Sequence, residues 1–172
     1  MTIPVLNAVV YAAIGAIALS AASPAVPSMD GWKVDRCPIC RTAIYKHPRW
    51  IATIYYEENG HLRHLAFDGV KEMLRFLYHP ERWGYSKNFA KHVKRLVVRD
   101  FETRKPIWAK KAWYVVGGDL RGPHGVALIP FGSREQAQDF KVRHRGLRVL
   151  RFEQLTPALI DRLAEEGGRD NR

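Results

Sequence analysis

The sequence predicts an α+β protein built from two tandem ββαβ units that follow an N-terminal apolar segment. Two observations predict this fold class: strand and helix patterns occur in the same order in both halves of the chain, and matching residues recur 64 positions apart. Phe67 corresponds in this way to Phe131, and Phe76 corresponds to Phe140. Self-similarity at a fixed spacing is typical of a repeated structural unit.

The chain begins with an apolar segment that has the layout of an export signal. No charged residue precedes Asp30, and residues 5–22 are almost all apolar. Ser23-Pro24-Ala25 offers a small-x-small cleavage site, and the apolar run is also about as long as the ~17–25 residues that span a bilayer. We expect residues 1–25 to be a signal peptide or membrane anchor and residues 26–36 to be a linker. The body is then periplasmic, either soluble or tethered to the inner membrane.

The chain is strongly basic, with 28 Lys and Arg against 17 Asp and Glu among 172 residues and a formal net charge of +11. Such a charge favours nucleic-acid binding in many proteins. An exported protein, however, meets anionic lipid surfaces and acidic protein surfaces instead. We therefore expect an acidic partner surface or an anionic membrane surface, and no nucleic acid.

The first unit, residues 37–104, is predicted to contain a hairpin followed by a helix and a further strand. Glu58-Asn59-Gly60 is a turn signal between two runs rich in β-branched and aromatic residues. Asp68 precedes apolar residues at helical spacing, and we expect it to cap that helix. The expected elements are strands at 50–56, 62–67 and 96–98 and a helix over 70–77.

The second unit, residues 105–155, repeats this order. Ser133 and Gln136 form a capping-box pattern at the start of its helix. A short helix and a tail follow over residues 156–172, and the polar tail is expected to fray from Gly167. The expected strands of this unit are 112–116, 126–131 and 148–152.

Cys37-Pro38-Ile39-Cys40 contains both cysteines of the chain and is its sharpest chemical motif. Two thiolates at this spacing can bind one soft metal ion or pair as a disulfide. A thioredoxin-like motif needs a long helix after the second cysteine, whereas Pro48 follows closely here with no amphipathic run between. A closed zinc site needs a second cysteine pair, so a histidine would have to complete a metal site. Metal binding, a disulfide and some other role all stay open on this motif alone.

Among the seven histidines, His124 has the setting that best projects a single side chain. It lies in Gly122-Pro123-His124-Gly125, a turn between two predicted strands, and its alternative interpretation is an exposed turn residue. His61 and His64 are three apart on a strand, so they point to opposite faces and cannot bind one ion together. The sequence contains no convincing catalytic triad, phosphate loop or carboxylate pair, so we predict no enzyme activity.

Together these motifs resemble those of NosL, a family of copper-binding accessory proteins of nitrous oxide reductase, over about residues 36–155. The family pattern Cys-Pro-x-Cys is similar to Cys37–Cys40, Phe-Asp-Gly to Phe67–Gly69, Ala-x-Tyr-Val-x-Gly to Ala112–Gly117, and Gly-Pro-Met-Gly to Gly122–Gly125. The resemblance implies two tandem ββαβ units and a bound Cu(I) ion. It also implies delivery of copper to an acceptor metalloprotein or transporter.

Three departures from the family pattern change the expected ligands. The Gly-Met after the second cysteine is Arg41-Thr42 here, and the Met of the turn is His124. The lipoprotein cysteine is missing as well, because Val34-Asp35-Arg36 before Cys37 is not a lipobox. We therefore expect Cys40, Cys37 and His124 to bind Cu(I), with Zn(II) as an alternative, since two thiolates and an imidazole suit both ions.

The leading prediction is an exported copper chaperone that is not itself catalytic. One rival interpretation, motivated by the missing methionines, is a basic interaction module of a membrane-associated complex that has no metal role. Another is a thiol–disulfide enzyme that uses Cys37 and Cys40.

Overall fold

The strand and helix patterns fold into two antiparallel sheets and three α-helices in the computed structural model, which describes residues 25–27 and 35–170. Residues 1–24, which hold nearly all of the predicted signal or anchor segment, lie outside the described residues, as do residues 28–34 of the predicted linker. Within the described part of the chain, no helix combines the length and the apolar character needed to cross a membrane.

The first sheet begins with the predicted hairpin. It contains β1 (Ala52–Glu58), β2 (His61–Phe67), β3 (Val93–Arg99) and β4 (Pro106–Trp108), in the order β2-β1-β3-β4. Asn59 and Gly60 connect β1 to β2 with φ values of 52° and 77°. Positive φ at both turn residues matches the twist of the flanking strands, so the predicted turn is confirmed.

The three strands of the second sheet are arranged like the first three strands of the first sheet. It contains β5 (Trp113–Gly122), β6 (Gly125–Phe131) and β7 (Arg148–Arg151), in the order β6-β5-β7. In each sheet the first strand of the unit is central, with its hairpin partner on one side and the strand that follows the helix on the other. This arrangement confirms two tandem ββαβ units. Strand β4 follows residue 104, where the first unit was expected to end, and it extends the first sheet by pairing with β3.

Three α-helices are described: α1 (Val70–Tyr78), α2 (Arg134–Arg143) and α3 (Pro157–Asp170). Short 3-10 turns lie at Ile44–Lys46, Pro80–Trp83, Phe89–His92, Ala109–Lys111 and Phe152–Gln154. The Ser133 side chain accepts a hydrogen bond from the Gln136 amide, which confirms the predicted cap of α2. The predicted frayed tail is wrong, because α3 continues past Gly167 and buries it.

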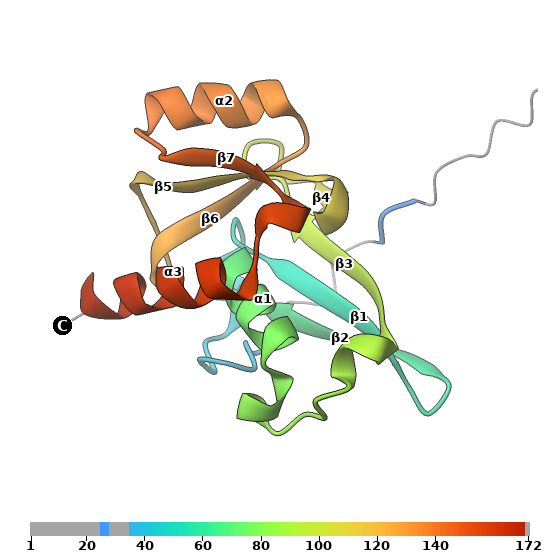
Figure 1. Ribbon diagram of the computed structural model, residues 1–172. Coiled ribbons are helices and arrows are strands. Elements are labelled where there is room, and N and C mark those ends of the chain that lie inside the picture. Colours follow the sequence, from blue (N-terminus) through green and yellow to red (C-terminus); the bar gives the residue numbers. More distant parts are fainter. Residues whose placement is uncertain (1–24, 28–34, 171–172) are drawn as a thin grey trace, which may run out of the picture.

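The second sheet is covered on both faces (Figure 1). Helix α2 packs on one face, while α1 and α3 lie on the other face next to β6. Alternate residues of β5 therefore enter different cores, as the period of two in a strand requires. Tyr114 and Val116 join the large core shared with the first unit, and Val115 joins the smaller core under α2 with Phe131 and Phe140.

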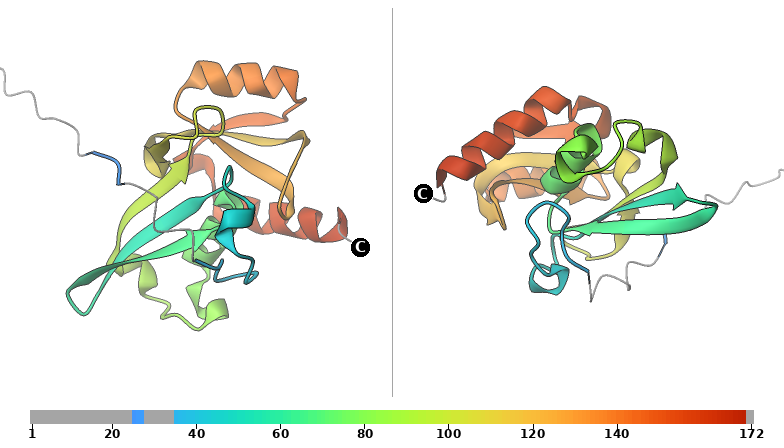
Figure 2. Two further views of the ribbon diagram at one scale, coloured as in Figure 1. Left: turned by 180° about the vertical axis from the view of Figure 1, so that it is seen from behind. Right: turned by 90° about the horizontal axis from the view of Figure 1, so that it is seen from below.

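The tip of the β5–β6 hairpin lies against α3 (Figure 2). Gly125 has a φ of 77°, and a Cβ added there would come within 2.6 Å of the Cα of Gly167. A Cβ on Gly167 would in turn collide with the carbonyl oxygen of His124. Two glycines thus allow the hairpin and the helix to approach at backbone distance, which fixes His124 relative to α3.

Comparing Gly125→Ala with Gly60→Ala separates backbone strain from this close approach. Both glycines have a φ of 77°, but nothing lies within 4 Å of a Cβ on Gly60. We expect Gly60→Ala to lower the free energy of unfolding by about 1 kcal/mol, and Gly125→Ala to lower it by about 1–3 kcal/mol more because of overpacking. Urea denaturation measures both values. Equal losses would show that α3 does not dock on the hairpin tip.

Candidate metal centre

The two cysteines lie in a tight loop that closes before the first sheet begins. Arg36 and Ala43 form an isolated antiparallel bridge at its base. The Cys37 amide donates to the carbonyl of Thr42 at 2.9 Å, and the Arg41 amide donates to the carbonyl of Cys37 at 2.9 Å. Both thiols are free, and Cys37 is fully buried whereas Cys40 is partly exposed.

Arg41 occupies a left-handed position in this loop, with a φ of 63°. This is the position at which the resemblance places a glycine. Left-handed backbone costs an ordinary residue roughly 1–2 kcal/mol, because its Cβ approaches the following carbonyl. The loop therefore keeps the glycine-type turn after the second cysteine although its sequence has changed.

Asp68 connects the cysteine loop to the second unit. The Cys40 thiol donates to Asp68 Oδ2 at 3.1 Å, and Nε2 of His124 lies 2.9 Å from the same oxygen. The expectation that Asp68 caps α1 is wrong: the cap position is Gly69, and no side chain caps the helix. The Asp68 carboxylate is instead fully buried and directed between Cys40 and His124.

The structure groups two of the three predicted ligands, Cys37 and Cys40, with Asp68. Ligand atoms of Cys37, Cys40 and Asp68 all lie within 4.8 Å of one another. His124 is not part of this group of three and reaches it through its contact with Asp68. Asp68 was missed as a site residue because an aspartate before a helix predicts a cap. The signal in the sequence that could have identified Asp68 as a site residue is its place in the Phe67-Asp68-Gly69 motif.

Lys71 fixes the backbone that carries His124. Its buried Nζ donates to the carbonyl of His124 at 2.7 Å and to that of Val126 at 3.1 Å. Glu72, which is buried as well, places Oε1 3.7 Å from this ammonium. Asp68 thus lies just before the cap of helix α1, and Lys71, the second residue of this helix, anchors the β5–β6 turn.

The electrostatics of the site favour a protonated thiol beside an ionised carboxylate. Burial raises the pKa of the Cys37 thiol, and the charge of Asp68 raises it further. Burial alone would raise the pKa of Asp68, but its hydrogen bonds with His124 and Cys40 outweigh burial and lower that pKa. The hydrogen bond to Asp68 raises the pKa of His124 above its usual value.

This donor set fits a soft or borderline metal ion. It offers two sulfur atoms and one imidazole, which are ligands that such ions prefer. Within the described residues, Oδ1 of Asp68 is a buried oxygen without a hydrogen-bond partner. A cation bound beside the two free thiols would give this oxygen the partner that it lacks.

Comparison with known proteins identifies the family. The family model named NosL matches residues 31–160. The chain belongs to the NosL family. The copper-binding lipoprotein NosL of Stutzerimonas stutzeri is 32% identical over 139 residues, which cover 78% of this chain and 70% of that protein. The crystal structure of the copper chaperone NosL from Shewanella denitrificans superposes with a TM-score of 0.63 at 24% identity, over 78% of this chain and 99% of that chain.

The match to the Shewanella structure confirms the NosL fold for the two-unit architecture described above. Within this NosL-family chain, the cysteine loop and Asp68 come from the first unit and His124 comes from the second. The candidate metal centre therefore lies at the junction of the repeats.

The His124–Asp68 pair predicts a pH dependence of the metal-free protein. Because folding raises the pKa of His124, its stabilising contribution is complete below the unfolded value near 6.5 and is lost as pH rises through the folded pKa. Because folding lowers the pKa of Asp68, its contribution is present above 3.8 and is lost as pH falls through the lower folded pKa. Urea unfolding of chelator-treated protein should therefore show a loss of stability with rising pH above about 6.5.

The variant His124→Asn reports on this contribution, since titrating groups that do not interact with His124 cancel in the comparison with wild type. The free energy of unfolding of the wild type should exceed that of His124→Asn at pH 6, and we expect this difference to shrink as pH increases from 6 to 8.5. An advantage that stays constant over this range would show that His124 and Asp68 do not interact as a charged pair.

Proposed function

We propose that this chain binds Cu(I) as cargo and passes it to an acceptor metalloprotein or transporter, without catalysing a reaction. The observation that carries the proposal is the contact of one buried carboxylate, Asp68, with Cys40 and His124, which belong to different units. Cys37 completes the donor set from within the same cluster. Membership in a family whose relatives are named for copper binding supports the choice of metal.

Cu(I) is the ion that this donor set suits best. Thiolates select Cu(I), whereas carboxylates suit harder ions. We therefore assign Cys37, Cys40 and His124 as the ligands and Asp68 as the residue that orients His124. A carboxylate that accepts the second ring N–H of a ligating histidine fixes the ring and raises its basicity. Zn(II) is the competing ion, since three ligands with an open position also suit zinc.

Loading the site requires proton loss and a small rearrangement. The thiols must lose their protons when copper binds, so the hydrogen bond from Cys40 to Asp68 is given up. Asp68 keeps its contact with Nε2 of His124, which leaves Nδ1 as the donor atom. Because His124 lies outside the group formed by the sulfur atoms and Asp68, its ring must move toward the sulfurs.

The exposure of the ligands suits a site that releases its ion. The side chain of His124 is 32% exposed, while Cys37 is completely buried. An acceptor can therefore approach from the imidazole side while Cys37 still holds the ion. The substitution of an imidazole for a methionine also gives release a proton-dependent component that a thioether lacks.

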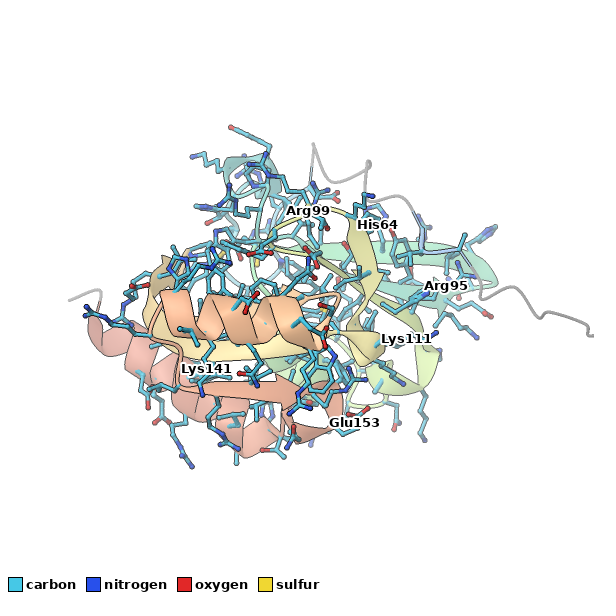
Figure 3. The ribbon with its side chains drawn as sticks, turned by 90° about the horizontal axis from the view of Figure 1, so that it is seen from above. His64, Arg95, Arg99, Lys111, Lys141 and Glu153 are labelled. Atoms are coloured by element: carbon cyan, nitrogen blue, oxygen red, sulfur yellow. The ribbon has the colours of Figure 1, made fainter. Side chains whose placement is uncertain are left out.

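We place this protein in the periplasm, either soluble or tethered by its N-terminal apolar segment, with an acidic partner or membrane surface. The relative from Stutzerimonas is named as a lipoprotein, which supports an exported setting. Figure 3 shows Arg95 and Lys111 projecting on one side of the molecule, whereas Lys141 lies on α2 away from them. The positive charge is thus distributed over several faces, which suits general attraction to anionic surfaces.

Anaerobic competition for Cu(I) against a chromophoric chelator tests the proposal. We expect Asp68→Asn to weaken binding about 10- to 100-fold, as is usual for a residue that orients a ligand. We expect Cys40→Ser and His124→Ala to weaken binding at least as much, because each removes a ligand. Parallel titration with Zn(II) reports which ion binds more tightly.

His144→Ala is the matched control, since Nδ1 of His144 lies 3.0 Å from Asp119 in a similar histidine–aspartate pair outside the site. Its Cu(I) affinity should equal that of wild type. Wild-type affinity in the double variant Cys40→Ser, His124→Ala would contradict the proposal and favour an interaction module without a metal role.

A further inference from the structure

A cavity of about 160 Å³ opens beside the metal centre, between α1 and α3. Its lining includes Cys40 and His124, together with Lys71, Glu72, Arg75 and Ala164. Cys37 and Asp68 do not line this cavity. A molecule in this cavity would therefore contact two of the proposed ligands, Cys40 and His124, but not the third, Cys37.

The cavity wall contains buried polar atoms without partners. Glu72 is 3% exposed, and its Oε1 has no hydrogen-bond partner within the described chain. Its nearest cationic group is Nζ of Lys71 at 3.7 Å, which is already shared between two carbonyls. Nε of Arg75 is buried without a hydrogen bond as well. Two unpartnered polar atoms from α1 in the lining of one cavity indicate that a polar group enters it.

The size of the cavity limits what can enter. An engineered protein cavity of about 150 Å³ accommodates a benzene molecule. The space beside Cys40 therefore admits one side chain or a small molecule, but not a folded segment or a bulky aromatic chelator.

We propose that this cavity admits one cysteine side chain of the acceptor protein, which takes Cu(I) by ligand exchange at the Cys40–His124 side. This inference rests on the proposed copper-binding function. The lining carries the ammonium of Lys71 and the guanidinium of Arg75 against the one carboxylate of Glu72. This excess of positive charge favours an anionic donor over a neutral thioether, and the thiolate is the anionic donor that Cu(I) prefers.

The exchange conserves charge and oxidation state. The incoming thiol loses its proton to water, and its thiolate forms a bond to copper. The bond to the His124 imidazole then breaks, and the neutral ring remains with Asp68. The bond to Cys40 breaks next, and its thiolate takes up one proton. Copper stays Cu(I) throughout. Cys37, which is fully buried, leaves last. Its thiolate takes up one proton from water as a second donor of the acceptor replaces it on the ion.

Ala164→Leu tests the path by filling the cavity without touching a ligand. The protein is loaded with Cu(I) and mixed with bathocuproine disulfonate, which is too bulky for the cavity, while free cysteine is added as the small exchanging thiol. We expect the cysteine-dependent rate of copper transfer to fall about tenfold or more in Ala164→Leu, with the equilibrium affinity for Cu(I) unchanged. Ala158→Leu, at an exposed position of the same helix, should leave the rate unchanged.

Arg75→Gln provides a second variant that leaves the cavity open. It should slow transfer driven by cysteine more than transfer driven by imidazole, because only the thiolate is anionic. Alkylation of Cys40 by iodoacetamide in the metal-free protein gives a readout without copper, and it should also slow in Ala164→Leu.

Transfer and alkylation rates in Ala164→Leu within twofold of the wild-type rates would overturn the path while leaving the copper site intact. Failure of the wild-type protein to bind Cu(I) would overturn the proposed function and this path with it. The alkylation result would then still show whether the cavity gives access to Cys40.

Discussion

The buried ammonium of Lys71 joins the two units of this NosL-family chain beside the candidate metal centre. It donates to the carbonyls of His124 and Val126 at 2.7 and 3.1 Å, so helix α1 of the first unit holds the β5–β6 turn of the second. A buried carbonyl left without a donor costs about 1–3 kcal/mol, so the loss of this ammonium would destabilise the contact between the two units. Asp68 precedes the same helix and contacts His124 directly. The backbone of His124 is therefore anchored by α1, and its ring contacts the residue that precedes the cap of this helix.

This attachment explains how a duplicated fold forms one asymmetric site. Each unit alone has a sheet and a helix, but the soft donors come from the loop before the first sheet and the turn within the second. A histidine at position 124 suits this arrangement, because an imidazole can bind an ion and a carboxylate at once. A thioether offers no N–H to Asp68. His124 therefore makes a contact with Asp68 that a methionine at this position could not make.

The sequence predicts those features that depend on near neighbours. Ser133 caps α2 through an amide three residues away, and Asn59-Gly60 sets its own turn, so both follow from local patterns. The role of Asp68 depends on Cys40 and His124, which are 28 and 56 residues distant, and local reasoning gave it a helix cap instead. Gly167 looks like part of a polar tail until its contact with the hairpin tip is known. Tertiary packing decides both cases.

X-ray absorption at the copper edge of the Cu(I)-loaded protein tests most directly whether both units hold the ion. We predict a coordination shell of two sulfur atoms and one imidazole nitrogen in the wild-type protein, because Cys37, Cys40 and His124 are the assigned ligands. The imidazole signature should disappear in His124→Ala while both sulfur atoms remain. A wild-type shell that contains sulfur alone, or an imidazole signature that survives in His124→Ala, would contradict a site shared between the two units.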